Sequence, residues 1–147
     1  MKKKIITGVV VAVLLIGFLS LFPHKMAFKE TVSVCTQEGE TATVEFDVVL
    51  WKYWYMQDSL KGSVTVDGVR YEHLDYERYG AKSRSFLFAV PKGDMLERLD
   101  NSLEILLYGK DFEGFSIMPL HNEDAELYYG PAETAEDAEM IIKSIID

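Results

Sequence analysis

The chain divides into an unbroken apolar run and a longer region in which apolar and polar residues alternate. The run extends from Ile5 to Phe22 and follows Lys2–Lys4. As a helix, these residues would span roughly 27 Å at 1.5 Å per residue, close to the thickness of a bilayer's hydrocarbon core. The pattern predicts an N-terminal transmembrane helix that contacts the lipid bilayer through residues 5–22.

The same segment has the basic start of a secretory signal peptide. Its apolar run is longer than the usual core of about 7–15 residues, and no small-x-small cleavage site follows it. We therefore expect a retained signal anchor, with secretion after cleavage as the alternative. Since lysines favour the cytoplasmic side, the N-terminus is expected inside the cell and the rest outside it, in a bacterial cell envelope.

Three regions follow from this interpretation: an anchor at residues 1–22, a spacer at 23–29 and a β-rich domain at 30–147. In the domain, apolar residues recur at every second position, which is typical of half-buried strands. The predicted strands are Lys29–Cys35, Ala42–Leu50, Ser85–Val90, Ser102–Tyr108 and Phe112–Met118, with a possible edge strand at 127–129.

The clearest local signal is Asp67-Gly68 between two alternating runs, a two-residue hairpin signature. Pairing Val66 with Val69 places Val64 opposite Tyr71 on one face. The same register pairs polar residues on the other face, so both patterns are satisfied together.

Two helices are predicted from capping signals. Asp94 can cap a short helical turn over Met95–Leu99. Thr134, with Asp137 three positions later, can form a capping box for a C-terminal helix over 134–146. The buried stripe of that helix is expected to comprise Ala138, Ile141, Ile142 and Ile145.

About seven strands followed by one substantial helix predict a mainly β (α+β) fold. We expect an antiparallel β-sandwich-like domain or a strongly curved sheet, with the helix packed across an end. In a sandwich, the connection through Met95–Leu99 would cross between the two sheets.

Charge and cysteine content narrow the possible partners. The net charge is −9, and it becomes −12 without Lys2–Lys4. This excess of negative charge argues against nucleic acid as a partner. Its simpler explanation is that surface charge keeps the domain soluble. The single cysteine, Cys35, excludes an intrachain disulfide and is expected as a buried thiol in a strand.

The segment from Trp51 to Tyr55 is the first candidate for ligand binding. Trp51, Tyr53 and Tyr55 alternate along one predicted strand face, with Trp54 opposite. Such aromatics can stack on sugar rings or offer rigid contact area to a protein, whereas the simpler interpretation is an aromatic end to the core. Contact with the bilayer surface is a third reading.

The segment Leu74–Arg84 is the second candidate and is predicted to be a loop. It contains Tyr76 and Tyr79 among charged residues, with His73 just before it. Binding residues often lie on loops, although a charged loop is more often simply solvated.

No motif for catalysis, a cofactor or a metal is present. His24, His73 and His121 lack metal-ligand spacing, and the oxygen-bearing residues Asn122, Glu123, Asp124 and Glu126 lack the spacing of a calcium loop. We therefore expect a membrane-tethered extracytoplasmic binding module, without catalysis or a cofactor, whose partner is a protein or glycan. The alternatives are a small cell-envelope hydrolase and a structural subunit of an envelope complex.

Overall fold

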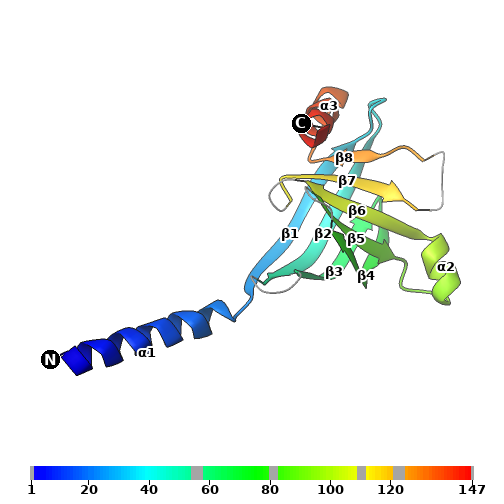
Figure 1. The fold of residues 1–147 in the computed structure, drawn as a ribbon. Helices are drawn as coiled ribbons and strands as arrows, with labels where there is room; N and C mark the ends of the chain where they lie inside the picture. The colour runs from blue at the N-terminus through cyan, green and yellow to red at the C-terminus, as the bar shows by residue number, and fades with distance from the viewer. Residues whose placement is uncertain (1, 54–57, 80–82, 109–111, 121–124, 147) are drawn as a thin grey trace.

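The computed structural model describes residues 2–53, 58–79, 83–108, 112–120 and 125–146 (Figure 1). The elements in chain order are α1 (Lys2–Ser20), β1 (His24–Cys35), β2 (Thr41–Lys52), β3 (Ser59–Val66), β4 (Val69–Tyr79), β5 (Ser83–Ala89), α2 (Met95–Asp100), β6 (Ser102–Tyr108), β7 (Gly114–Pro119), β8 (Tyr128–Gly130) and α3 (Ala135–Ile146). Strands β1 to β8 form a closed barrel in sequential order, and each is antiparallel to its neighbours.

The predicted sandwich-like fold is wrong, because the sheet closes on itself. Strand β8 pairs with β7 through Ser116 and Tyr129, and it pairs with β1 through Tyr129 and Cys35. The three-residue β8 therefore joins the two ends of the sheet. The segment Met95–Leu99 does not cross between sheets, since α2 connects β5 to its antiparallel neighbour β6.

Two further segments differ from their predicted conformations. Strand β1 begins at His24, so residues 24–29 are strand rather than spacer. The predicted loop at Leu74–Arg84 is largely strand, because β4 continues to Tyr79 and β5 begins at Ser83. The β4–β5 register shifts between His73 and Glu77, and such a bulge breaks the alternation by which a strand is detected in the sequence.

The predicted hairpin at Asp67-Gly68 is confirmed, including its register from Val66↔Val69 to Ser63↔Glu72. Both turn residues have positive φ angles, +46° and +82°, as a type I′ turn requires. The Asp67 carboxylate also accepts a hydrogen bond from the Thr43 amide, at 3.1 Å, which ties this turn to β2.

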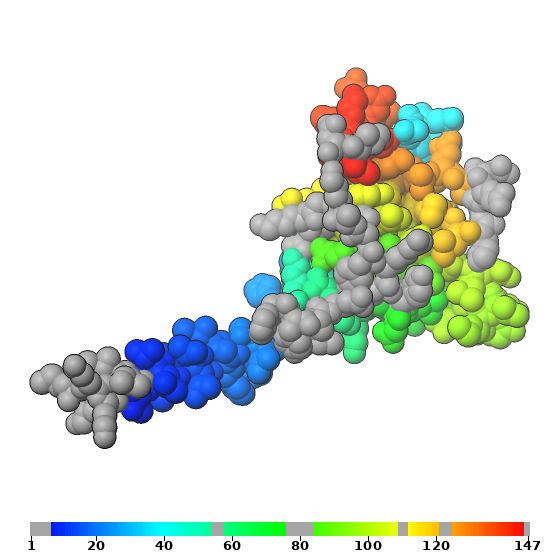
Figure 2. All heavy atoms as spheres, viewed as in Figure 1, coloured from blue at the N-terminus to red at the C-terminus, as the bar shows by residue number. Residues whose placement is uncertain are grey.

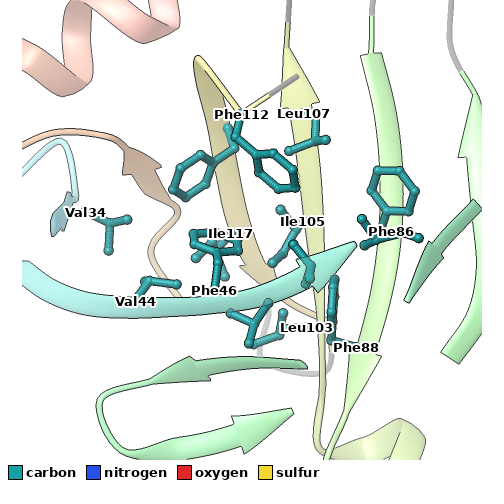
Figure 3. Packing of buried hydrophobic residues seen from close by; sticks show 14 of the residues in the cluster. Val34, Val44, Phe46, Phe86, Phe88, Leu103, Ile105, Leu107, Phe112 and Ile117 are labelled. Carbon is teal, nitrogen blue, oxygen red and sulfur yellow. The ribbon is translucent and has the colours of Figure 1, made fainter. Parts of the chain in front are cut away.

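Apolar side chains fill the barrel interior (Figure 3). Phe46 lies at the centre of an aromatic group, with its ring centroid 5.1 Å from Phe115 and 5.5 Å from Phe112. Phe28 stacks on Phe112 at 4.3 Å. The other large, fully buried side chains are Phe86, Phe88, Leu50, Leu60, Ile105, Leu107, Ile117, Val34, Val44, Val48 and Val64.

Helix α3 packs outside the barrel over the closing strand. Its Ala138 forms a second buried cluster with Cys35 and Ala132, so the predicted burial of Cys35 is confirmed. The predicted capping box is also present, because the Asp137 amide donates to Thr134 Oγ1 and the Thr134 amide donates to the Asp137 carboxylate.

The predicted transmembrane anchor is corrected by the structure. No helix in the described part of the chain is long and apolar enough to cross a membrane. In the structure, Lys2–Lys4 lie within the first turn of α1 and the helix ends at Ser20, before Phe22. The signal-anchor, single-pass and extracytoplasmic assignments depended on this helix and are not retained. Figure 2 shows α1 standing clear of the barrel.

We expect Gly62→Ala to destabilise the fold much more than Gly39→Ala. Both glycines have positive φ angles, so alanine is strained at either position by about 1–2 kcal/mol. At Gly62 an added Cβ would also overlap the Asp47 carbonyl oxygen and lie 2.8 Å from Val48 Cα, whereas Gly39 has open space. Urea unfolding measures the difference, and equal losses for the two variants would contradict the packing of β3 on β2.

The α3 cap should make stability fall at acid pH. The Thr134 side-chain hydrogen bond and the Glu133 backbone amide lower the pKa of Asp137, outweighing a small opposing effect of burial. A lowered native pKa means that the stabilisation is complete above the unfolded-state pKa, about 3.9, and is lost as the pH falls through the native value. Asp137→Asn should flatten this acid limb in urea titrations from pH 5 to pH 2, and an unchanged limb would contradict the assignment.

Candidate functional site

The two predicted candidate segments approach each other at one end of the barrel. We call this end the mouth: β2 ends there at Lys52, β3 begins at Ser59, β4 ends at Tyr79 and β5 begins at Ser83. In an antiparallel barrel of sequential strands, the β2–β3 and β4–β5 connections must lie at the same end. Segments that are separate in the sequence thus become neighbours.

Trp51 lies on the outer face of the barrel near the mouth. Its neighbour Leu50 points into the core and is fully buried, so alternation directs Trp51 outward. Trp51 is partly exposed and belongs to neither buried cluster. The Lys25 ammonium of β1 lies 5.4 Å from the Trp51 ring centroid, within the range of a cation–π contact.

Tyr53 follows β2 and is also partly exposed. Its amide donates to the Asp58 carboxylate at 3.2 Å, and Asp58 accepts a second bond, at 2.6 Å, from Arg84 of β5. The Asp58 and Arg84 side chains are only 18% and 19% exposed, so this ion pair is shielded from water. It ties the end of the β2 segment at Tyr53 and the start of β3 at Asp58 to β5 of the barrel wall.

The remaining predicted site residues are described less fully. Tyr76 and Tyr79 lie in β4, where Tyr79 pairs with Arg84 in the backbone register. Tyr55 and Trp54 lie outside the described residues. Of the predicted set, the structure thus brings together Trp51, Tyr53 and the Tyr79 backbone at the mouth.

A second concavity, which the sequence did not reveal, lies between α2 and the β4 bulge. Its volume is about 650 Å³, and its apolar lining comes from Leu74, Leu87 and Leu99. His73 reaches its inner wall, where its side chain is 3% exposed and its ring packs edge-on against Phe88 at 5.4 Å. The sequence feature that could have indicated this site is the pair Met95 and Leu96, two apolar residues on a helix too short to bury them. Their side chains are 77% and 73% exposed.

The charged groups of the described chain do not assemble a metal site. Among the described residues, no group of three or more His, Cys, Asp and Glu side chains could hold a metal ion. Of the residues whose spacing was compared with a calcium loop, Asn122, Glu123 and Asp124 lie outside those ranges. The pKa of Glu38 is raised, first by a side-chain hydrogen bond with Glu126 and then by the negative charge of that neighbouring carboxylate. Both effects favour the protonated, neutral form of Glu38.

Comparison with known proteins adds no functional assignment. No family model, curated protein or solved structure matches this chain. The candidate sites therefore rest on geometry and chemistry alone.

We expect Arg84→Met to destabilise the protein by about 1.5–3 kcal/mol, the usual contribution of a hydrogen bond to a charged group. The substitution leaves the Asp58 carboxylate in a shielded position without its 2.6 Å partner. The matched control is Lys29→Met, which removes an ion pair with Asp47 whose side chains are 78% and 65% exposed and should cost less than about 1 kcal/mol. Equal unfolding free energies of the two variants would contradict the shielding at the mouth.

Proposed function

We propose that this protein is a binding module that captures a macromolecular partner, a protein or a glycan, at the mouth of its barrel and has no catalytic activity of its own. The observation that carries the proposal is the outward placement of Trp51 outside both buried clusters. Flat aromatic side chains supply large contact areas at little conformational cost, whether the surface they cover is a protein or a sugar ring.

The anchoring of the aromatic segment supports the same proposal. The Asp58–Arg84 pair holds the segment that carries Trp51 and Tyr53 in place before any partner arrives. A surface that is already ordered loses less entropy on binding, which favours affinity. Lys25 beside Trp51 adds a positive charge that suits an acidic or electron-rich partner.

A hydrolase remains the alternative and would use the hollow beside α2. General acid–base hydrolysis needs two suitably placed groups, such as a histidine with carboxylates. The hollow contains His73 and the carboxylate of Asp75, whose Oδ1 lies 4.0 Å from His73 Nδ1. A second carboxylate is missing from its lining, so the aromatic mouth is the better supported site.

Trp51→Ala and Tyr53→Ala should abolish partner capture while the barrel stays folded. Because Trp51 faces outward, its loss should reduce the unfolding free energy by only about 0.5–1 kcal/mol, the value of an exposed cation–π contact. Immobilised wild-type protein and variants are compared for what they retain from a native cell extract. Met95→Ala, which removes an exposed apolar side chain far from the mouth, is the matched control.

Pre-treating the extract separates the two partner classes. Protease should remove a protein partner, and glycosidase should remove a glycan. Capture by both aromatic variants at the wild-type level would refute the proposal. Unfolding of both the Trp51→Ala and the Tyr53→Ala variants would show that these aromatic side chains belong to the core.

A further inference from the structure

Strand β1 is much longer than the strand that closes the barrel against it. It has twelve residues, whereas β8 has three and pairs with β1 only at Cys35. One more hydrogen bond follows, from the Ala132 amide to the Ser33 carbonyl at 2.9 Å. Between His24 and Thr31, no described residue pairs with the side of β1 that faces away from β2.

The direction of the β1 backbone groups follows from that last bond. Successive residues of a strand point their N–H and C=O groups to opposite sides, and the Ser33 carbonyl points away from β2. The N–H and C=O groups of Thr31, Lys29, Ala27 and Lys25 must therefore point to the same side. Together they form an edge about 20–23 Å long, at about 3.3 Å per residue, with which no residue in the described ranges pairs.

Two features indicate that the described part of the barrel wall is open beside this edge. Glu30 pairs with the buried Phe46, so it occupies a position whose side chain should face the barrel interior, yet it is exposed. Val32, at another inward-facing position, is only partly buried. Val34, the next inward-facing residue and the one beside β8, is fully buried. The inner side of the opening is lined by Phe28, which stacks on Phe112.

The edge itself is regular enough to accept another strand. Its register with β2 is continuous from His24 to Cys35, without a bulge or a proline. Natural edges avoid indiscriminate pairing by being short, bulged or interrupted by proline, or by carrying lysines and inward-pointing charges, and this edge has only the charges, at Lys25, Lys29 and Glu30. The lysines at 25 and 29 project from its outer face, where Lys25 lies over Trp51 and Lys29 forms an exposed ion pair with Asp47 at 3.2 Å. An exposed pair of this kind contributes little, so both ammonium groups can turn to an acidic strand and would repel a basic one.

We propose that the β1 edge from Lys25 to Thr31 binds an extended acidic peptide segment of a partner protein by antiparallel strand addition. Main-chain hydrogen bonds supply the attachment in this mode, and alternate side chains supply the specificity. Acidic residues of the added strand lie beside Lys25 and Lys29, and apolar residues between them lie beside Phe28 and Val32. The edge meets the mouth at Lys25, which lies over Trp51, but the proposal depends on the β1 backbone and not on the aromatic side chains.

The probe is a labelled, end-capped seven-residue peptide in which Glu alternates with Val, and binding is followed by fluorescence anisotropy with the full-length protein. In antiparallel pairing, the Glu amides face β1 and the Val amides face away. N-methylation of the Glu residues should therefore weaken binding at least tenfold, whereas N-methylation of the Val residues should leave it nearly unchanged. Equal effects of the two methylated peptides would overturn the proposal.

Protein variants test the same edge from the other side. Ala27→Pro removes an amide that does not pair with β2, so it should weaken peptide binding at least tenfold with an unchanged urea midpoint. Lys29→Glu keeps the backbone intact and should weaken binding by a similar factor at low salt, in contrast to the control Lys92→Glu on a distant turn.

A second copy of the chain is the competing occupant. Sedimentation showing a concentration-dependent dimer that Lys29→Glu dissociates would assign the edge to self-association and overturn the peptide proposal. Wild-type peptide affinity in both Ala27→Pro and Lys29→Glu would overturn it as well.

Discussion

The structure depends on how the sheet closes between its first and last strands. Seven of the junctions in this barrel are antiparallel ladders of three or more residue pairs, but the eighth, between β8 and β1, has the single pair Cys35↔Tyr129. Tyr129 pairs with Ser116 on one side and Cys35 on the other, and α3 covers this junction through Ala138. Where β8 ends, the aromatic stack of Phe28 on Phe112 fills the interior instead of a hydrogen-bonded ladder.

This arrangement links the stability of the fold to its possible interactions. The closed part of the junction buries Cys35 and Val34 completely, whereas the open part leaves the Glu30 side chain in water. The mouth is built differently, since the Asp58–Arg84 pair holds the backbone of Tyr53 beside Trp51. The barrel therefore offers two kinds of surface, an unpaired strand edge and an anchored aromatic patch.

Local features of this fold were predictable from the sequence, and long-range ones were not. The Asp67-Gly68 hairpin, the Asp94 cap of α2 and the Thr134–Asp137 capping box all depend on residues a few positions apart, and all are present. Period-two alternation identifies strands but is the same in a sandwich and a barrel. Closure depends on Cys35 meeting Tyr129, a contact across most of the chain that no local pattern encodes.

The errors at the candidate sites have similar causes. The β4 bulge interrupts the alternation, so the sequence pattern there predicts a loop instead of a strand and gives no sign of the hollow at His73. The aromatic segment was found because Trp51 and Tyr53 are unusual residues, but only the three-dimensional fold places Trp51 outside the core. The apolar N-terminal run predicted a membrane-spanning helix, which the described structure does not contain.

Native-state hydrogen exchange along β1 is the most direct test of this account. The amides of Phe28, Glu30 and Val32 face β2 and should be protected, while those of Ala27, Lys29 and Thr31 face the opening and should exchange far faster. An alternating pattern of protection is therefore predicted. Uniform protection of both sets would show that this edge is covered, and the account of an incompletely closed barrel would be wrong.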